Sequence, residues 1–394
     1  MRNLNDVSLK GKRILLRVDL NSPIENGKII INPRIKAHAG TIRELSDRGA
    51  KLIVISHQGR KGEHDFTSLE QHAKILKELA GRHVEFIDHV IGEEVKNAVM
   101  KLKDGEIIVL GNVRNLDDET KADGKIVHEL TPLVDYFVLD ALSIAHREHA
   151  SVVGFTKTVP SYAGPVLAQE LNALKRIDHG EKIIFIIGGS KIHDAYLLLK
   201  RWLKLGRVEK VLLAGVPGIL SLHAHGHSVG PSYRHLEKLH LIHDEPELKA
   251  MMQQYDPLLR HPVDIAVDDH GQRKETGIEN ITHEIKDIGP KTIALFRDEI
   301  KKAKIIIMNG SPGVYEEEQF GEGTKAILQA IAESSAYSII GGGHTITAIE
   351  KFNIPKEKFG YISLSGKAFL ECLEGKELPA LKALEENETH LFDK

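Results

Sequence analysis

Short apolar runs alternate with segments of helical periodicity over nearly the whole chain. In the first half, β-forming runs occur at 14–16, 29–31, 52–55, 84–87, 107–110 and 136–139. Apolar residues at helical spacing between the runs predict helices over 35–45, near 95–102, and after a Thr67–Glu70 capping box. Strands that alternate with helices in this way indicate a parallel sheet with helical crossovers.

The pattern begins again after Gly164-Pro165. A predicted helix over 166–177 is long enough to connect two domains, and further strands are expected at 183–187, 211–213, 265–267, 305–308, 338–340 and 362–364. A chain of 394 residues also exceeds what one hydrophobic core usually supports. The prediction is an α/β fold of two doubly wound parallel-sheet domains joined by a helix, with a cleft between them. We expect the N-terminal domain at 1–163, the connecting helix at 164–178 and the C-terminal domain at 179–376.

The composition limits the kinds of molecule that the protein is expected to bind. The formal net charge of −3 argues against a nucleic-acid partner, because such proteins normally carry a basic excess. The single cysteine excludes an intrachain disulfide and is typical of a reducing compartment. The N-terminus lacks the apolar run of a signal peptide, and no apolar segment is long enough to span a bilayer. We therefore expect a cytoplasmic protein with small-molecule ligands and no membrane partner.

Polar and basic residues follow three of the early apolar runs. They are Arg17, Asp19 and Asn21, then Arg34 and His38, then His57, Gln58, Gly59, Arg60 and Lys61. The carboxyl ends of parallel strands are where such sheets bind ligands, and the guanidinium group suits phosphate and carboxylate oxygens. A small anionic ligand is the favoured interpretation for the group; a surface ion pair or a cap is the alternative for any single residue.

Three glycine-rich turns follow predicted strands of the second half. Gly188-Gly189-Ser190-Lys191 precedes a helix, Asn309-Gly310 leads to Gly313 and Glu316, and Gly341-Gly342-Gly343 leads to His344 and Thr345. Such turns let backbone N–H groups approach an anion, and Lys191 adds a mobile positive charge. The Walker A spacing is absent, and a single turn of this kind is otherwise only a helix start. The three together predict a nucleotide site, and two anionic ligands on two domains suit phosphoryl transfer.

In content and order, these motifs resemble the phosphoglycerate kinases, with an archaeal character. The matching segments are 17–23, 33–35, 56–60, 112–114, 140–147, 188–191, 287–292, 309–316 and 341–343. The resemblance implies reversible phosphoryl transfer between 1,3-bisphosphoglycerate with ADP and 3-phosphoglycerate with ATP, by hinge closure. It also implies magnesium with the nucleotide, with no separate metal site in the protein, and return of the C-terminal tail, 377–394, to the first domain. We expect a monomer, with a dimer as the alternative.

The resemblance assigns roles to single positions. Arg34 and Lys191 would be catalytic, Arg34 by steadying the transferring phosphoryl group and Lys191 by guiding it. The substrate would bind to Asp19, Asn21, Arg34, His57, Gln58, Gly59, Arg60, Arg114 and Arg147. The nucleotide would bind to Gly188, Gly189, Lys191, Asn309, Gly310, Gly313, Glu316, Gly341, Gly342, Gly343, His344 and Thr345.

Three positions depart from the family pattern, all toward the nucleotide side. The glycine loop of the family is here Leu364-Ser365-Gly366-Lys367-Ala368, where the side chains either obstruct the phosphoryl group or replace its lost amide contacts with a lysine charge. His344 stands for an aspartate that helps to hold the magnesium nucleotide, although neutral imidazole is a poor magnesium ligand. Ala195 stands for a second lysine.

These departures leave three hypotheses open. The favoured one is an active kinase of archaeal type. The others are a paralogue that binds its ligand without catalysis, and a kinase for another phosphorylated carboxylate. Outside these motifs, His223, His225 and His227 lack an evident carboxylate partner nearby, so no metal site is expected there. Cys372 and Trp202 lie in apolar helical patterns and are expected in the core.

Overall fold

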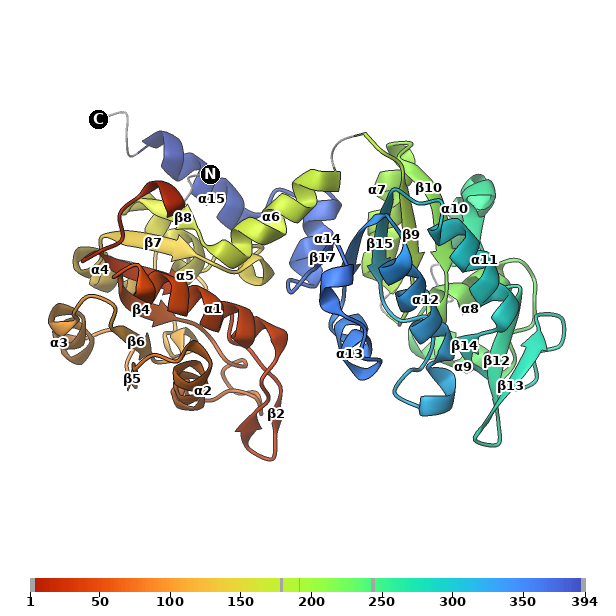
Figure 1. Ribbon diagram of the computed structural model, residues 1–394, viewed down its shortest axis with the longest axis horizontal. Coiled ribbons are helices and arrows are strands. Elements are labelled where there is room, and N and C mark those ends of the chain that lie inside the picture. The colour runs from red at the N-terminus through yellow and green to blue at the C-terminus, as the bar shows by residue number, and fades with distance from the viewer. Residues whose placement is uncertain (1–3, 178–179, 191, 242–244, 391–394) are drawn as a thin grey trace. The chain divides into compact units, whose positions relative to one another are not determined.

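The computed structural model describes residues 4–177, 180–190, 192–241 and 245–390, and the chain forms two compact units (Figure 1). Unit 1 comprises residues 1–172 and 375–394, and unit 2 comprises residues 173–374. The helix α6 (Pro165–Ile177) begins in unit 1 and ends in unit 2. Each unit is built on a parallel sheet, which confirms the predicted fold class. Among the described helices, none has the length and apolar character needed to cross a bilayer.

The sheet of unit 1 has six parallel strands in the order β5-β6-β4-β1-β7-β8. Their bounds are β1 (Arg13–Arg17), β4 (Lys51–Ile55), β5 (Val84–Ile87), β6 (Ile107–Leu110), β7 (Tyr136–Leu139) and β8 (Ser161–Ala163). In the central strands every residue after the first of β1 and β4 is buried, as continuous apolar runs in a parallel sheet require. Arg17 is in register with Ile55 and Leu139, so the segments after β1, β4 and β7 leave the sheet at one edge.

Helices and a C-terminal return complete unit 1. The helices are α1 (Pro33–Asp47), α2 (Glu70–Ala80), α3 (Glu93–Lys101), α4 (Lys125–Leu130), α5 (Ala150–Val153) and α15 (Pro379–His390). Asn387 on α15 accepts a bond from the Ser161 amide at 2.9 Å and donates to the Thr156 carbonyl at 2.6 Å. These buried bonds attach the end of the chain to β8 and its neighbours.

Two sequence predictions for unit 1 were wrong in detail. The run at 29–31 is not a strand of the parallel sheet: β3 (Lys28–Ile29) forms a short antiparallel hairpin with β2 (Ile24–Glu25). The turn is Asn26-Gly27, both with positive φ, which is the strongest short hairpin signal in a sequence. The capping box at α2 also does not form, because the Glu70 amide donates to the Ser68 hydroxyl at 3.2 Å instead.

Unit 2 holds a parallel sheet of order β11-β10-β9-β15-β16-β17. Its strands are β9 (Ile183–Ile187), β10 (Val208–Leu213), β11 (Leu259–Arg260), β15 (Ile305–Asn309), β16 (Tyr337–Gly341) and β17 (Tyr361–Ile362), so the strand predicted at 362–364 ends at Ile362. Asn309 is in register with Ile187 and Gly341, which brings the three glycine-rich turns to one edge.

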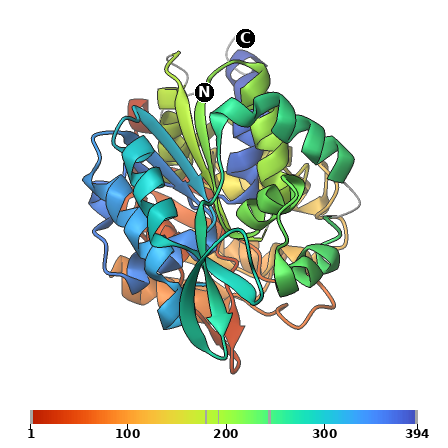
Figure 2. The ribbon, with the colours of Figure 1, turned by 90° about the vertical axis from the view of Figure 1, so that its right-hand side faces the viewer.

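The run at 265–267 does not join this parallel sheet, contrary to the prediction. It lies in β12 (Asp264–Asp269), which pairs antiparallel with β13 (Gln272–Gly277) and β14 (Glu284–Ile288). A tight turn at His270-Gly271, both with positive φ, reverses the chain directly after β12. Figure 2, which faces this unit, shows the teal hairpin apart from the parallel sheet.

Eight helices lie wholly in the described part of unit 2. They are α7 (Ile192–Lys204), α8 (Gly215–Ala224), α9 (Tyr233–Lys238), α10 (Glu245–Tyr255), α11 (Pro290–Ile300), α12 (Glu322–Glu333), α13 (Gly343–Lys351) and α14 (Lys367–Leu373). Trp202 is buried against Phe185 of β9, with ring centroids 6.0 Å apart, and its indole donates to the Leu373 carbonyl at 2.9 Å. The core prediction is therefore confirmed for Trp202, whereas Cys372 is only half-buried.

Candidate active site

Arg17 and Asp19 form the buried floor of the first candidate site. Arg17 ends β1 and is 1% exposed, and its Nε donates to the Ser151 hydroxyl at 3.0 Å. Burial lowers the pKa of Arg17 to about 10, and the neighbouring carboxylates of Glu119 and Asp19 offset part of this effect. The arginine therefore remains charged at neutral pH. Arg17 is not among the residues predicted to bind the substrate, although it is the first residue of the motif 17–23 on which that prediction rests.

Asp19 links several of the predicted residues. Its Oδ2 accepts hydrogen bonds from Arg34 Nη1 at 3.1 Å and from the Ser143 hydroxyl at 2.5 Å. Its Oδ1 accepts the Asn21 amide at 3.1 Å. Burial opposes ionisation, but the guanidinium of Arg34 and the hydrogen bond from Ser143 stabilise the carboxylate, and the pKa of Asp19 lies below its usual value. Asp19 thus orients Arg34, whose helix α1 begins only one residue earlier.

His57 lies between two guanidinium groups. Its Nδ1 is 3.3 Å from Arg17 Nη2, and its Nε2 is 3.5 Å from Arg147 Nη1. Burial lowers the pKa of His57 well below its usual value, and the adjacent arginines lower it further against the opposing charge of Asp19. At neutral pH the ring is therefore uncharged, so the positive charge of this site comes from arginine.

Three arginines of the site make no ion pair with the described residues of the protein. Among the described residues, no carboxylate oxygen lies within ion-pair distance of the guanidinium groups of Arg60, Arg114 or Arg147. Burial, followed by the repulsion of Arg147 and Arg60, lowers the pKa of Arg114. Like charges at one edge of a sheet destabilise the free protein. Such a cluster is typical of a site whose ligand supplies several negative charges.

Two of the predicted binding residues also hold the loop after β4. Gln58 donates to the Ser22 carbonyl and accepts the Ser22 amide, both at 2.9 Å. Asn21 Oδ1 accepts the Gly59 amide at 2.9 Å. Gly59 has a positive φ, and a side chain there would lie 2.3 Å from the backbone of Asp65. A ligand contact for Gln58 stays a prediction, since its amide is already used by the loop.

Two buried polar residues next to Arg17, namely Glu119 and Ser151, were not recognised as part of the site from the sequence. Glu119 is 2% exposed, and its carboxylate accepts the Ser151 hydroxyl at 2.5 Å. Burial raises the pKa of Glu119, against the opposing charge of Arg17. The sequence shows Glu119 only as one acid in a polar loop, so its position beside β1 carries no local signal. His38, which the sequence had already singled out, contacts Asp140 Oδ2 at 3.0 Å and accepts a hydrogen bond from the Asp19 amide.

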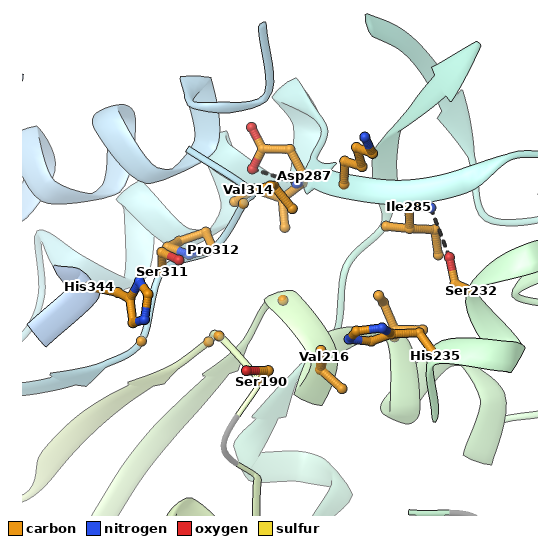
Figure 3. Close-up of a pocket in the computed structure, with 18 of the residues that line it drawn as sticks. Ser190, Val216, Ser232, His235, Ile285, Asp287, Ser311, Pro312, Val314 and His344 are labelled. Carbon is orange, nitrogen blue, oxygen red and sulfur yellow. Dashed lines mark hydrogen bonds between the residues drawn. The ribbon is translucent and has the colours of Figure 1, made fainter. Parts of the chain in front are cut away.

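The three glycine-rich turns of unit 2 surround a cavity of about 320 Å³. The cavity lies at the carboxyl ends of β9, β10, β15 and β16, and residues of β12, β14 and α8 close its other side. Figure 3 shows His344 and Ser311 on one side, and His235 and Ser232 on the opposite side. Of the predicted nucleotide residues, all of the following line this cavity: Gly188, Gly189, Asn309, Gly310, Gly313, Glu316, Gly342, Gly343, His344 and Thr345. Lys191 lies outside the described residues.

Gly188 and Gly310 let the strand-end loops approach each other. A Cβ at Gly310, where φ is +86°, would lie 2.2 Å from the Gly188 carbonyl oxygen. A Cβ at Gly188 would lie 2.4 Å from the Ser311 carbonyl oxygen. The Gly188 amide donates to Asn309 at 3.0 Å, and the Gly189 amide to Ser311 at 2.8 Å. These two glycines are therefore required by backbone packing, whatever the ligand.

The N-terminus of α13 presents both an altered residue and an unsatisfied one. His344 is exposed, and its Nδ1 lies 3.3 Å from Glu316 Oε1. Thr345 is fully buried, and its hydroxyl has no hydrogen-bond partner among the described residues. A buried hydroxyl without a hydrogen-bond partner is energetically costly. Gly341 lies directly before this turn, at the end of β16.

The cavity has an apolar end that the sequence did not reveal. Val216, Ile219 and Leu222 of α8 line it together with Ile265 and Ile285. These residues come from α8 and from the antiparallel sheet, whose positions depend on contacts between distant segments. An apolar slot beside glycine-rich turns suits a flat ring attached to a phosphorylated group.

The altered loop lies at the start of α14. Ser365 is buried, Gly366 has a positive φ, and Lys367 is the first helical residue. Lys367 Nζ lies 3.9 Å from Glu371 Oε1 one turn along the same helix, and its side chain is 64% exposed. Among the described residues, neither Ser365 nor Lys367 lines the cavity.

An arginine cluster on one α/β unit and a glycine-lined cavity on the other suit a phosphotransferase. The family model described as phosphoglycerate kinase matches residues 4–376. A phosphoglycerate kinase of Methanopyrus kandleri is 39% identical over 393 residues, covering 97% of this chain and 96% of that protein. One of Saccharolobus solfataricus is also 39% identical, with the same coverage.

Solved structures agree with the sequence relatives. The crystal structure of phosphoglycerate kinase from Pyrococcus horikoshii OT3 has a TM-score of 0.92 at 36% identity, covering 99% of this chain and all of that one. The structure of phosphoglycerate kinase from Coxiella burnetii has a TM-score of 0.81 at 33% identity, covering 97% and 98%. The chain therefore belongs to the phosphoglycerate kinase family, and the predicted family and enzyme class are confirmed.

Proposed function

We propose that this protein transfers a phosphoryl group reversibly between 1,3-bisphosphoglycerate and ADP, giving 3-phosphoglycerate and ATP. The observation that carries the proposal is the cluster of Arg60, Arg114 and Arg147, for which the described residues supply no carboxylate partner. A phosphorylated three-carbon acid brings both a phosphate and a carboxylate to such a cluster. Membership of the family makes this acid the substrate of choice.

The first site would bind the acid through side chains. Arg60, Arg114 and Arg147 would neutralise its anionic groups, and His57 would be held uncharged between Arg17 and Arg147. Arg34, oriented by Asp19 at 3.1 Å, would stabilise the charge that develops on the transferring phosphoryl group. Asn21 and Gly59 would keep the loop in place.

The second site would bind the nucleotide largely through backbone. The turns at 188–190, 309–313 and 341–343 would bring their backbone close to the phosphates, and the apolar end of the cavity would hold the base. Glu316 would contact the ribose, and Lys191 would guide the phosphoryl group. At the same place, the buried hydroxyl of Thr345 has no hydrogen-bond partner among the residues that the structure describes.

Magnesium fits this site as part of the magnesium nucleotide. His344 is directed to Glu316 and its imidazole is a poor ligand for magnesium. Oxygen donors are nevertheless present, in the hydroxyl of Thr345 and the side-chain amide of Asn309. We propose that phosphate oxygens and water would supply most of the magnesium ligands. Thr345 and Asn309 would supply the remaining oxygen donors or bind the coordinated water. The metal would neutralise phosphate charge.

Because each substrate would bind on a different unit, we propose that transfer occurs when the two units close on each other. Closure would exclude water, which otherwise competes as the acceptor. We further propose that the protein is cytoplasmic and monomeric. Size-exclusion chromatography with light scattering tests whether it is a monomer.

A coupled assay tests the proposed activity. The purified protein is supplied with 3-phosphoglycerate and MgATP, and the acyl phosphate formed is reduced by an excess of glyceraldehyde-3-phosphate dehydrogenase with NADH. We expect NADH oxidation that requires both substrates. Binding of 3-phosphoglycerate by calorimetry without turnover would instead indicate a paralogue that binds without catalysis. Turnover only with other phosphorylated carboxylates would indicate a different substrate.

A further inference from the structure

Two histidines and an aspartate converge on unit 2, outside the residues assigned above. His225 follows α8, Asp256 begins the 3-10 turn before β11, and His261 follows β11. His225 Nε2 lies 3.0 Å and His261 Nε2 lies 3.2 Å from the same atom, Oδ1 of Asp256. The two imidazole rings have their centroids 4.3 Å apart. Asp256 is thus the carboxylate partner that the sequence around His225 did not show.

The hydrogen bond at Nδ1 of His225 determines whether its Nε2 carries a proton. Its Nδ1 lies 2.7 Å from the Ser221 carbonyl oxygen, which can only accept, so Nδ1 carries a proton. In the neutral ring, Nε2 then presents a lone pair to a carboxylate oxygen 3.0 Å away, which is repulsive. Either a second proton on His225 or a cation between the two atoms removes this repulsion.

We propose that His225, Asp256 and His261 bind a divalent transition-metal ion of the zinc class. Bonds of about 2.0–2.1 Å in a tetrahedron give ligand separations of about 3.3 Å, close to the two nitrogen–oxygen distances here. Two imidazoles with one carboxylate form a ligand set typical of zinc, with water in the remaining position. The bond from His225 to Ser221 fixes the tautomer that ligates through Nε2.

The third ligand, His261, is the more buried of the two histidines, with 22% of its side chain exposed against 36% for His225. The Nδ1 of His261 is buried without a partner among the described residues, and metal binding at Nε2 would place a proton there. Because burying an N–H group without a partner is unfavourable, we expect micromolar rather than tighter affinity for the metal.

The site would join three segments of unit 2 at the end of α8. Residues of the same helix, Val216, Ile219 and Leu222, line the cavity, and Pro262 next to His261 does so too. The metal would therefore tie one wall of the cavity to the β11 segment, and its expected role is structural.

A second cluster serves as a matched control. Asp269, His270 and His283 also bring their ligand atoms within 4.8 Å of one another. There, however, Lys274 Nζ lies 2.9 Å from Asp269 Oδ2 and supplies the positive charge itself. We expect no metal at this second cluster.

Titration with Co²⁺ tests the proposal, because its visible absorption reports ligand number and geometry. Untagged full-length protein, freed of metal with a chelator, is titrated at pH 7.5, with His225→Ala, Asp256→Asn and the double variant His270→Ala/His283→Ala in parallel. We expect one Co²⁺ per chain with a four-coordinate spectrum for the wild type and the double control variant. The affinity should fall at least tenfold in the other two variants, whose folding is checked by Trp202 fluorescence.

Competition by protons provides a second readout. Co²⁺ affinity should fall as the pH drops below about 6, because the histidines must lose their protons to ligate. Equal stoichiometry and spectra in the His225 variant and the wild type would overturn the proposal. So would an absence of stoichiometric binding, with NMR showing a doubly protonated His225 at pH 7.

Discussion

The two candidate sites of this protein are built in opposite ways. In unit 1, the site consists of long charged side chains held in place by buried partners, as Asp19 holds Arg34 at 3.1 Å. In unit 2, the site is built around glycine-rich turns, where Gly188 and Gly310 let two loops meet. The first site is defined by charge, and the second by shape and by exposed backbone groups.

The difference indicates which substitutions each site tolerates. Removing a charge from unit 1 leaves the backbone intact and should change binding or catalysis without unfolding the unit. Adding even a methyl group at Gly188 or Gly310 displaces backbone, so stability and binding should fall together. The predictions below test this contrast, in order of decreasing effect.

The largest effect is expected for Gly310→Ala. The added Cβ would lie 2.2 Å from the Gly188 carbonyl oxygen, at a residue whose φ is +86°. We expect unit 2 to lose at least about 4 kcal/mol of stability and the protein to lose measurable ADP binding. Urea unfolding followed by Trp202 fluorescence measures the first, and calorimetry the second. Gly277→Ala, with open space around it, is the matched control and should leave both unchanged.

Arg34→Met should reduce kcat without unfolding unit 1. Loss of one preorganised donor to a developing charge typically costs about 100-fold to 1000-fold in rate. The coupled assay measures kcat, and circular dichroism checks the fold. Lys36→Met, an exposed residue on the same helix, makes the same change in charge and should have wild-type kcat. Equal losses in both variants would mean that overall charge, rather than the position of Arg34, determines the rate.

The two units should respond differently to acid. In unit 1, burial lowers the pKa of His72 to about 4 and, together with nearby arginines, that of His149 to about 4. A lowered pKa means that the unfolded chain binds the proton more tightly, so unit 1 loses stability as the pH falls from 6.5 to 4. For His72 the slope is about 1.4 kcal/mol per pH unit.

In unit 2, burial raises the pKa of Asp287 to about 6, against its bonds to Gly323 and Arg273. Here the folded state binds the proton more tightly, so protonation of Asp287 contributes stability to unit 2 as the pH falls from 6 to 4. Hydrogen exchange at β4 and β15, corrected for intrinsic rates, measures both units in one sample. We expect protection at β4 to decrease more than at β15. A larger decrease at β15 would contradict the assignment.

The smallest effect is expected at Lys367. Among the described residues, its Nζ makes only a 3.9 Å contact with Glu371, and its own side chain is 64% exposed, so we expect the pair to contribute little. Lys367→Gly and Lys367→Ala should both change kcat and the KM for ATP by less than about threefold. A tenfold gain would show that the lysine obstructs the phosphoryl group, and a tenfold loss that it participates.

Much of the fold could be predicted because the signals are local. The apolar runs that became β1, β4, β9 and β15 are continuous, and the register of parallel strands then brings their ends together. The family motifs lie at those ends. The hairpin at Asn26-Gly27 also had a local signal, which the apolar run at 29–31 obscured.

The rest depends on contacts between distant segments. Glu119 reaches Arg17 through Ser151, and nothing in its own loop indicates this position. Asp256 meets His225 across 31 residues, so the sequence around His225 shows no carboxylate. The antiparallel pairing of β12 likewise depends on partners on both sides, and a short apolar run alone does not distinguish it from a parallel strand.

Hydrogen exchange with each ligand alone tests the central contrast most directly. With 3-phosphoglycerate, we predict new protection at 18–21, 56–60 and 142–147 of unit 1. With MgADP, we predict new protection at 188–190, 309–316 and 341–345 of unit 2. Protection of the unit 2 turns by 3-phosphoglycerate, or of the arginine segments by MgADP alone, would contradict the account.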